Sequence, residues 1–221
     1  MSILSTCEIK CSCDEVFESE LWKAVSISDD PDLKNLVLSG QFNVVECPKC
    51  HKMFYWEHFF VYQDIVNEFV AYVYPKSFEK DAAYYRQKML GEFKEVAKTM
   101  KQEIDIDFEP ILFFGIEDLI ATINSEDYLK DEIDVLKFIA NDMGLDLITI
   151  KPSVARNMCI PHVLPKHKNA STVKQNVING LEKIVSYNPN LNEYKKLFER
   201  VCSYINSLEK ILLHVKKSKC Q

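Results

Sequence analysis

Glycine is scarce in this chain of 221 residues, and its five glycines are widely spaced. The two closest lie 24 residues apart, at positions 91 and 115. Phosphate-binding loops and dinucleotide-binding turns need several glycines within a few residues, so the sequence excludes both. The HExxH pattern of zinc peptidases and the GxSxG pattern of serine hydrolases are missing as well. No motif for a common reaction is therefore present.

Long apolar runs are also missing, because no stretch of eighteen apolar residues occurs. A membrane-spanning helix needs about 20 such residues, so we expect no membrane partner. The first seven residues are too short for the apolar segment of a secretion signal, and the charged Glu8 and Lys10 follow at once. These absences predict a cytoplasmic protein.

The chain as a whole lacks an excess of positive charge, since its net charge is −6. An acidic protein is a poor general binder of nucleic acids. The charge is uneven, however: residues 1–75 carry −7, residues 76–150 carry −8 and residues 151–221 carry +9. We expect the basic segment to pack on acidic parts of the same chain, with nucleic-acid binding through that segment as an alternative.

Cysteine, by contrast, is abundant near the start of the chain. Five of the eight cysteines lie in the first fifty residues, at positions 7, 11, 13, 47 and 50, and the other three are at positions 159, 202 and 220. In a cytoplasmic chain of this size, such crowding indicates metal binding and not disulfides.

Two pairs of these cysteines have the spacing of metal ligands. Cys11-Ser12-Cys13 and Cys47-Pro48-Lys49-Cys50 each form a tight turn that directs two thiolates at one point. Two such turns supply the four sulfurs of a tetrahedral zinc site, and iron is the alternative metal. Four thiolates leave no open position on the ion, so we expect a structural site and not a catalytic one.

The charge next to these cysteines supports the same interpretation. Four thiolates around a divalent ion leave a net negative charge, which nearby cations should offset. Lysine is rare before residue 76, yet three of the five lysines there flank the cysteines, namely Lys10, Lys49 and Lys52.

Other potential ligands carry weaker signals. Cys7 lies four residues before Cys11, and we interpret it as an inert thiol, with a spare ligand or a redox thiol as alternatives. Cys159, His162 and His167 resemble half of a zinc site, but the sequence shows no second half. We therefore interpret this second group as part of a proline-rich loop.

Residues 1–75 have the hydrophobic pattern of a β-rich module. Short strands are indicated by apolar runs at 42–46, 53–60 and 68–74. Residues 14–27 fit either a helix or a strand, and a helical turn at 33–38 ends before Gly40, which suits a left-handed cap. With the paired cysteines, this pattern predicts a zinc-ribbon-like β module at residues 1–75.

A different pattern begins after Pro75 and predicts a mainly helical region at residues 76–221. Apolar residues recur at steps of three and four in three segments, 78–100, 116–123 and 125–143. Short strands are indicated at 110–114 and 145–150. Residues 151–168 contain three prolines, so we expect mostly loop there.

The chain ends in two amphipathic stretches that predict a helical hairpin, with Asn188-Pro189-Asn190 as its turn. The second stretch repeats apolar residues every seven positions, with Ile205 near the middle. This apolar stripe is three positions wide in each heptad, which favours packing within the chain. Self-association through this helix is the alternative.

The order of the motifs resembles that of the CpXC-type proteins, a family of presumed metal-binding proteins named for their paired cysteines. The resemblance rests on the CxC pair, Asp30-Pro31-Asp32-Leu33-Lys34, Gly40-Gln41-Phe42-Asn43 and the CPxC pair. It continues at residues 114–120 and 132–137. The resemblance implies that Cys11, Cys13, Cys47 and Cys50 are the ligands. Glycine usually follows each pair in that family, whereas Asp14 and His51 stand there in this chain.

These observations predict an α+β protein with a small β module followed by a mainly helical region. We expect a non-catalytic zinc-binding adaptor that presents the β module or the helical hairpin to a protein partner. A redox protein or enzyme that uses a reactive thiol or an iron centre is the alternative.

Overall fold

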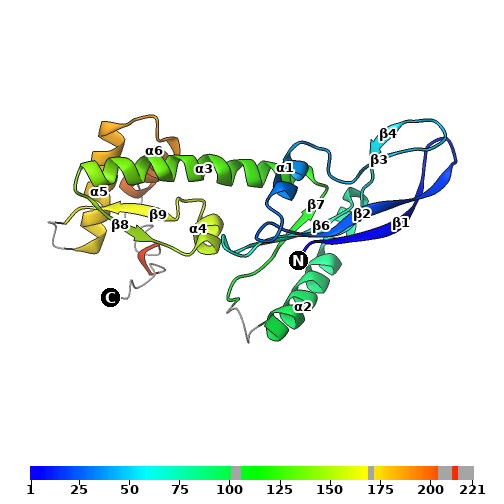
Figure 1. Ribbon diagram of the computed structural model, residues 1–221. Helices are drawn as coiled ribbons and strands as arrows, with labels where there is room; N and C mark the ends of the chain where they lie inside the picture. The colour runs from blue at the N-terminus through cyan, green and yellow to red at the C-terminus, as the bar shows by residue number, and fades with distance from the viewer. Residues whose placement is uncertain (101–105, 169–171, 204–210, 214–221) are drawn as a thin grey trace. The chain divides into compact units, whose positions relative to one another are not determined.

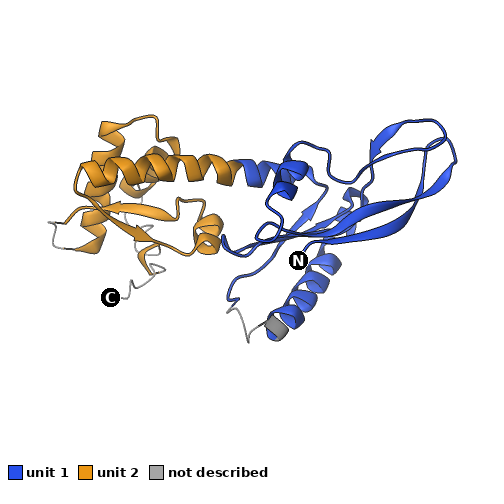
Figure 2. Ribbon diagram, in the orientation of Figure 1, with its two compact units in different colours: residues 1–124 blue, residues 125–221 orange. Residues whose placement is uncertain are grey.

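The computed structural model describes residues 1–100, 106–168, 172–203 and 211–213. The chain has a mixed α+β fold and divides into two compact units, residues 1–124 and residues 125–221 (Figures 1 and 2). The sequence pattern predicts a boundary after residue 75, but the units meet within helix α3 (Glu117–Asp142). The reason is that the chain returns to the sheet of unit 1 after Pro75, where strand β7 (Ile111–Phe114) pairs with strand β6 (Phe69–Tyr74).

Unit 1 is built on a mixed sheet with the strand order β1-β2-β5-β6-β7. The remaining members are β1 (Ile3–Lys10), β2 (Val16–Ser26) and β5 (Phe60–Asp64). β1–β2 and β5–β6 are antiparallel pairs, whereas β2–β5 and β6–β7 are parallel. The segment with the ambiguous pattern, residues 14–27, is therefore largely a strand.

Strand β6 is an inner strand of this sheet, and all six of its residues are buried. Phe69, Ala71 and Val73 belong to one apolar core, which also contains residues of α1 (Asp32–Leu38) and the first turns of α3. The other three residues of β6 belong to a second core, which contains residues of α2 (Ala82–Met100). Both faces of the sheet are thus covered, which explains why β6 is apolar without alternation.

The helices of unit 1 agree with the sequence pattern. A 3-10 turn η1 (Lys76–Asp81) precedes α2, close to the helix expected at 78–100. Gly40 follows α1 with a φ of 71°, the left-handed conformation expected for a cap. The apolar run at 53–60, in contrast, contains two strand segments, β4 (Met53–Tyr55) and the start of β5.

A second, two-stranded sheet completes unit 1. Strands β3 (Val44–Glu46) and β4 form an antiparallel hairpin. Val45 of this hairpin is buried with Ile9 of β1 and Leu21 of β2 in a small core of their own. This core packs the β3–β4 hairpin against the β1–β2 hairpin.

Unit 2 combines helices with a third sheet, an antiparallel pair of β8 (Asp146–Thr149) and β9 (Val163–Lys166). Its helices are α4 (Pro152–Met158), α5 (Val173–Tyr187), α6 (Asn192–Ser203) and most of α3. Residues 151–168, expected to be mostly loop, therefore contain α4 and β9. Pro152 permits α4 because it lies in the first turn of the helix, where a backbone N–H has no helical acceptor.

Helix α3 corrects the expectation of two helices at 116–123 and 125–143, because it runs without interruption from Glu117 to Asp142. Ser125 lies inside α3 and caps nothing there. Gly144 follows the helix with a φ of 64°, as expected for a residue that ends it.

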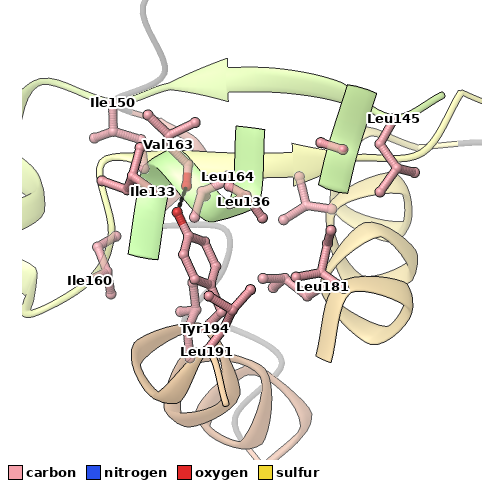
Figure 3. Packing of buried hydrophobic residues seen from close by; sticks show 14 of the residues in the cluster. Ile133, Leu136, Leu145, Ile150, Ile160, Val163, Leu164, Leu181, Leu191 and Tyr194 are labelled. Carbon is pink, nitrogen blue, oxygen red and sulfur yellow. Dashed lines mark hydrogen bonds between the residues drawn. The ribbon is translucent and has the colours of Figure 1, made fainter. Parts of the chain in front are cut away.

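The core of unit 2 surrounds the predicted helical hairpin of α5 and α6 (Figure 3). The fully buried Tyr194 of α6 donates a hydrogen bond to the Val163 carbonyl of β9 at 2.8 Å. The buried Glu132 carboxylate accepts the backbone amides of Asn192 at 2.8 Å and Glu193 at 3.0 Å, which satisfies the first turn of α6. Ile205, in the middle of the heptad pattern, lies outside the described residues.

Described residues of the same apolar stripe pack within the chain, since Tyr194, Leu197 and Val201 are buried in this core. In the part of the chain that the structure describes, no helix combines the length and the apolar character needed to cross a bilayer.

Two helical glycines give opposite predictions for a change to alanine. A Cβ atom at Gly180 of α5 would lie 2.6 Å from the Pro165 carbonyl oxygen, so Gly180→Ala should lower the free energy of unfolding by about 1–3 kcal/mol. A Cβ atom at Gly91 of α2 would meet nothing within 4 Å, so Gly91→Ala should raise it by up to about 1 kcal/mol through helix propensity. Chemical denaturation of both variants measures this, and a stabilised Gly180→Ala variant would contradict the close packing of α5 on β9.

Candidate metal centre

The four cysteines of the paired motifs lie in the loops of two hairpins. Cys11 and Cys13 are in the loop between β1 and β2, and Cys47 and Cys50 are in the loop between β3 and β4. The four sulfur atoms all lie within 4.8 Å of one another. The structure thus brings together all four of the residues that the sequence singles out as metal ligands.

The distances between the sulfurs suit a tetrahedral ion. Cys11 Sγ is 3.7 Å from Cys50 Sγ, and Cys13 Sγ is 3.6 Å from Cys47 Sγ. Zinc–sulfur bonds of about 2.3 Å place the sulfurs of a tetrahedral site about 3.8 Å apart. The four side chains are free thiols, so their oxidation state also fits metal binding. Each short distance joins one loop to the other.

The two loops are closed by the same pair of backbone hydrogen bonds. In each loop the first cysteine donates its amide to one carbonyl and accepts another amide with its own carbonyl. These bonds join Cys11 to Glu15 (2.8 Å) and Asp14 (3.0 Å), and Cys47 to Lys52 (3.1 Å) and His51 (2.9 Å). One pair is CxC and the other is CxxC. The backbone around the first cysteine nevertheless has the same hydrogen-bond pattern in both loops.

The residue after each cysteine pair has a left-handed backbone. Asp14 has a φ of 66° and His51 has a φ of 56°. A side chain is disfavoured in this region because its Cβ crowds the backbone, whereas glycine enters it freely. The family resemblance leads us to expect glycine at both positions, and the left-handed backbone found here is the conformation that glycine favours.

A buried amide links the second hairpin to the first. Asn43, only 6% exposed, accepts the Trp22 amide with its Oδ1 atom at 2.9 Å and donates its Nδ2 group to the Trp22 carbonyl at 3.2 Å. The Asn43 carbonyl also accepts the Trp56 amide at 3.0 Å. Asn43 therefore fixes the β3–β4 hairpin beside β2, a role that the sequence alone does not reveal because Trp22 is 21 residues away.

Two of the three lysines that flank the cysteines in the sequence connect the two loops at the surface. Lys49 of the second loop lies 3.2 Å from the Glu15 carboxylate, and Lys52 donates to the Ser12 hydroxyl at 3.4 Å. The bond to Glu15 raises the pKa of Lys49, and the nearby Cys13 and Cys47 thiols raise it further. A cationic side chain thus lies beside the sulfur cluster.

The pKa values of two cysteines in the cluster are shifted in opposite directions. A hydrogen bond with the Cys13 backbone lowers the pKa of Cys11 to about 6, although burial acts in the opposite direction. A backbone hydrogen bond at Glu15 also favours the Cys13 thiolate, but burial and the neighbouring thiols raise the pKa of Cys13 to about 12. Thiols this close cannot all carry charge unless a cation lies between them, so the cluster requires an ion for full deprotonation.

The sulfurs differ in their access to solvent. Cys11 and Cys47 are buried, Cys13 is half-buried and Cys50 is exposed. The core of Ile9, Leu21 and Val45 packs the two hairpins together, so the cluster is supported by protein and also accessible from solvent.

The remaining candidate residues lie elsewhere. Cys7 is on β1, where it packs against the small core of Ile9, and its Sγ atom faces the Ser5 carbonyl at 3.7 Å. His51 Nδ1 lies 2.9 Å from a Glu46 carboxylate oxygen of its own hairpin. Neither side chain belongs to the sulfur cluster.

The second group of potential ligands does not form a site among the described residues. Cys159 is exposed and ends α4 in a left-handed conformation. His167 Nε2 lies 3.1 Å from Lys183 Nζ, and the His162 carbonyl accepts the Ile150 amide. Within the described ranges, only the four cysteines form a group of three or more potential ligands.

The left-handed residues yield a prediction about stability. Asp14→Gly and His51→Gly should each raise the free energy of unfolding by about 1 kcal/mol, because glycine removes the Cβ strain. His51→Ala is the matched control and should give no gain, since alanine keeps the Cβ atom. Denaturant titrations of the variants measure this, and equal effects of glycine and alanine at position 51 would contradict a strained loop.

Comparison with family models matches residues 9–137 to the family described as CpXC protein. The match covers more than half of the chain and includes both cysteine pairs and much of α3. No curated protein and no solved structure matches the chain. The extent of the family match, together with the clustering of the four cysteines, shows that the chain belongs to the CpXC family.

Proposed function

We propose that the protein binds one zinc ion per chain through Cys11, Cys13, Cys47 and Cys50, in a zinc-ribbon-like module. The observation that carries this proposal is the meeting of four sulfurs from two loops, with distances of 3.6 and 3.7 Å across the loops. Soft thiolate ligands in tetrahedral arrangement suit zinc best, and iron is the competing metal.

The proposed zinc is structural. Four thiolates fill its coordination sphere and leave no position for water or a substrate. The β3–β4 hairpin has only three residues in each strand, and an isolated hairpin of this size is at best marginally stable. The ion therefore supplies folding free energy by tying this hairpin to the β1–β2 hairpin.

The wider role is that of a non-catalytic adaptor for a protein partner. Support comes from α3, on which Phe138 is 77% exposed and the neighbouring Val135 is 43% exposed. Large aromatic side chains are enriched in protein interfaces and are unfavourable in water. Asp131 and Asp142 are exposed on this helix and Asp134 is paired with Lys137 at 2.8 Å, so the apolar contact has a charged rim that favours a partner with polar and basic residues.

The proposed compartment is the cytoplasm. All seven cysteines among the described residues are free thiols, including the exposed Cys159 and Cys202. A reducing compartment keeps such thiols available, whereas secreted proteins usually pair them.

The metal site is tested by two matched cysteine substitutions. Cys47→Ser removes a buried sulfur of the cluster and should abolish binding of stoichiometric zinc and unfold the β3–β4 hairpin. Cys7→Ser removes a thiol outside the cluster and should leave the metal content unchanged. Elemental analysis of reduced, purified protein gives the metal content, and circular dichroism reports the fold.

Three results would overturn this proposal. One is a wild-type protein that folds fully without any metal. A second is stoichiometric iron with its visible absorbance, which would replace zinc by a redox-active centre. The third is a Cys7→Ser variant that loses as much metal as the Cys47→Ser variant, because Cys7 would then be a ligand.

The adaptor role is tested at the exposed aromatic of α3. Phe138→Ser should abolish capture of a binding partner from cell extract, because it removes the proposed apolar contact. Val66→Ser is the matched control, since Val66 is 79% exposed but lies in the β5–β6 turn. Quantitative mass spectrometry compares the proteins captured by the two variants with those captured by the wild type. An identical set of proteins on all three would contradict a role for this face.

A further inference from the structure

We propose that hydrogen peroxide converts the sulfur cluster into two disulfides between the loops, Cys11–Cys50 and Cys13–Cys47, which release the ion while the hairpins stay together. This inference rests on the proposed zinc site and assigns it a form of regulation. The protein would exchange a metal crosslink for a covalent one.

The pairing follows from distance and exposure together. Each short sulfur–sulfur distance joins a buried cysteine of one loop to a more accessible cysteine of the other. In the first pair Cys50 is exposed and Cys11 is buried; in the second pair Cys13 is half-buried and Cys47 is buried. An oxidant therefore reaches one sulfur of each pair first, and a protected partner lies within 3.7 Å to complete the disulfide.

The ion and contacts outside the cluster keep the loops adjacent while the first disulfide forms, and that disulfide then replaces the ion as the crosslink. The small core of Ile9, Leu21 and Val45 packs the two hairpins together below the sulfurs. The Asn43 amide fixes the β3–β4 hairpin to Trp22 of β2. These contacts involve no sulfur of the cluster, so oxidation leaves them in place.

The reaction balances with two molecules of peroxide. The Cys50 thiolate attacks one peroxide oxygen, the O–O bond breaks, and a sulfenic acid and a hydroxide ion form. The Cys11 thiolate then attacks the Cys50 sulfur, which forms the disulfide and expels a second hydroxide ion. Two thiolates lose two electrons, and one peroxide is reduced. Repetition at Cys13 and Cys47 removes the last thiolates, and the divalent ion is released.

The rival outcome is one disulfide within each loop, which would leave the two hairpins unlinked. Trypsin separates the two outcomes because it cleaves after Lys10, Lys23, Lys34, Lys49 and Lys52. The first loop then lies on peptide 11–23, Cys47 on peptide 35–49 and Cys50 on peptide 50–52. Disulfides between the loops join all three peptides, whereas disulfides within the loops leave peptide 11–23 separate.

The experiment uses the zinc-loaded full chain in which Cys7, Cys159, Cys202 and Cys220 are changed to serine, which limits oxidation to the cluster. Hydrogen peroxide is added in steps, and a chromogenic chelator measures released zinc. We expect full release after two equivalents of peroxide and a mass lower by four hydrogens than that of the reduced metal-free chain. Non-reducing tryptic digestion should give the three-peptide assembly.

Two double variants of this background test the specific pairing, and each keeps one thiol in each loop. Cys11→Ser/Cys50→Ser keeps the proposed pair Cys13–Cys47, and Cys11→Ser/Cys47→Ser keeps Cys13 and Cys50. The first should form its disulfide about tenfold faster with peroxide, because its thiols are already positioned. If these metal-free variants do not fold, fragmentation of the three-peptide assembly from the full cluster assigns the pairs instead.

The outcomes separate this inference from the zinc site itself. A purified chain that binds no metal overturns the proposed function. A chain that binds zinc but retains it after excess peroxide, forms disulfides within the loops or accumulates sulfinic acid overturns the redox inference and leaves the structural zinc site standing.

Discussion

The N-terminal part of the structure depends on the crowding of four thiols within 4.8 Å. Thiolates at this distance repel one another strongly, so the arrangement can be fully ionised only around a cation. The backbone hydrogen bond at Cys13 lowers the pKa of Cys11, whereas burial and the neighbouring thiols raise the pKa of Cys13 against its own backbone hydrogen bond at Glu15. The loop geometry, the cross-loop lysines and the small core of Ile9 all serve to hold this crowded group in place.

The backbone of both loops contains a strained residue that this geometry requires. Both loops use the same two hydrogen bonds around their first cysteine, and both need a left-handed residue after their second cysteine. Asp14 and His51 fill these positions although glycine would be less strained. The loop conformation is thus determined by the direction of the sulfurs, and the identity of the following residue is secondary to it.

The sequence predicts the site better than the fold around it. Spacing alone singles out Cys11, Cys13, Cys47 and Cys50, whose sulfurs cluster in the structure, because each close pair is brought together by local backbone geometry. The role of Asn43 cannot be predicted from spacing, because its partner Trp22 is distant in the sequence. Local sequence patterns also do not predict where the two units meet, because the parallel pairing of β6 with β7 is a long-range contact. Even the continuity of α3 through Ser125 depends on packing, since serine is common both at helix starts and on exposed helix surfaces.

The family match and the apolar cores distinguish the two parts of the chain. The match ends at residue 137, one position before the exposed Phe138. Among the described residues, the core of unit 2 contains only positions from 129 onwards, whereas the three cores of unit 1 end at Ile123. The two units therefore stabilise themselves through separate sets of buried residues. The cluster of four sulfurs joins the two hairpins of unit 1, whereas the hydrogen bond of Tyr194 and the capping by Glu132 lie in unit 2. Most of the family match and all four clustered cysteines thus lie in unit 1, and unit 2 has an apolar core of its own.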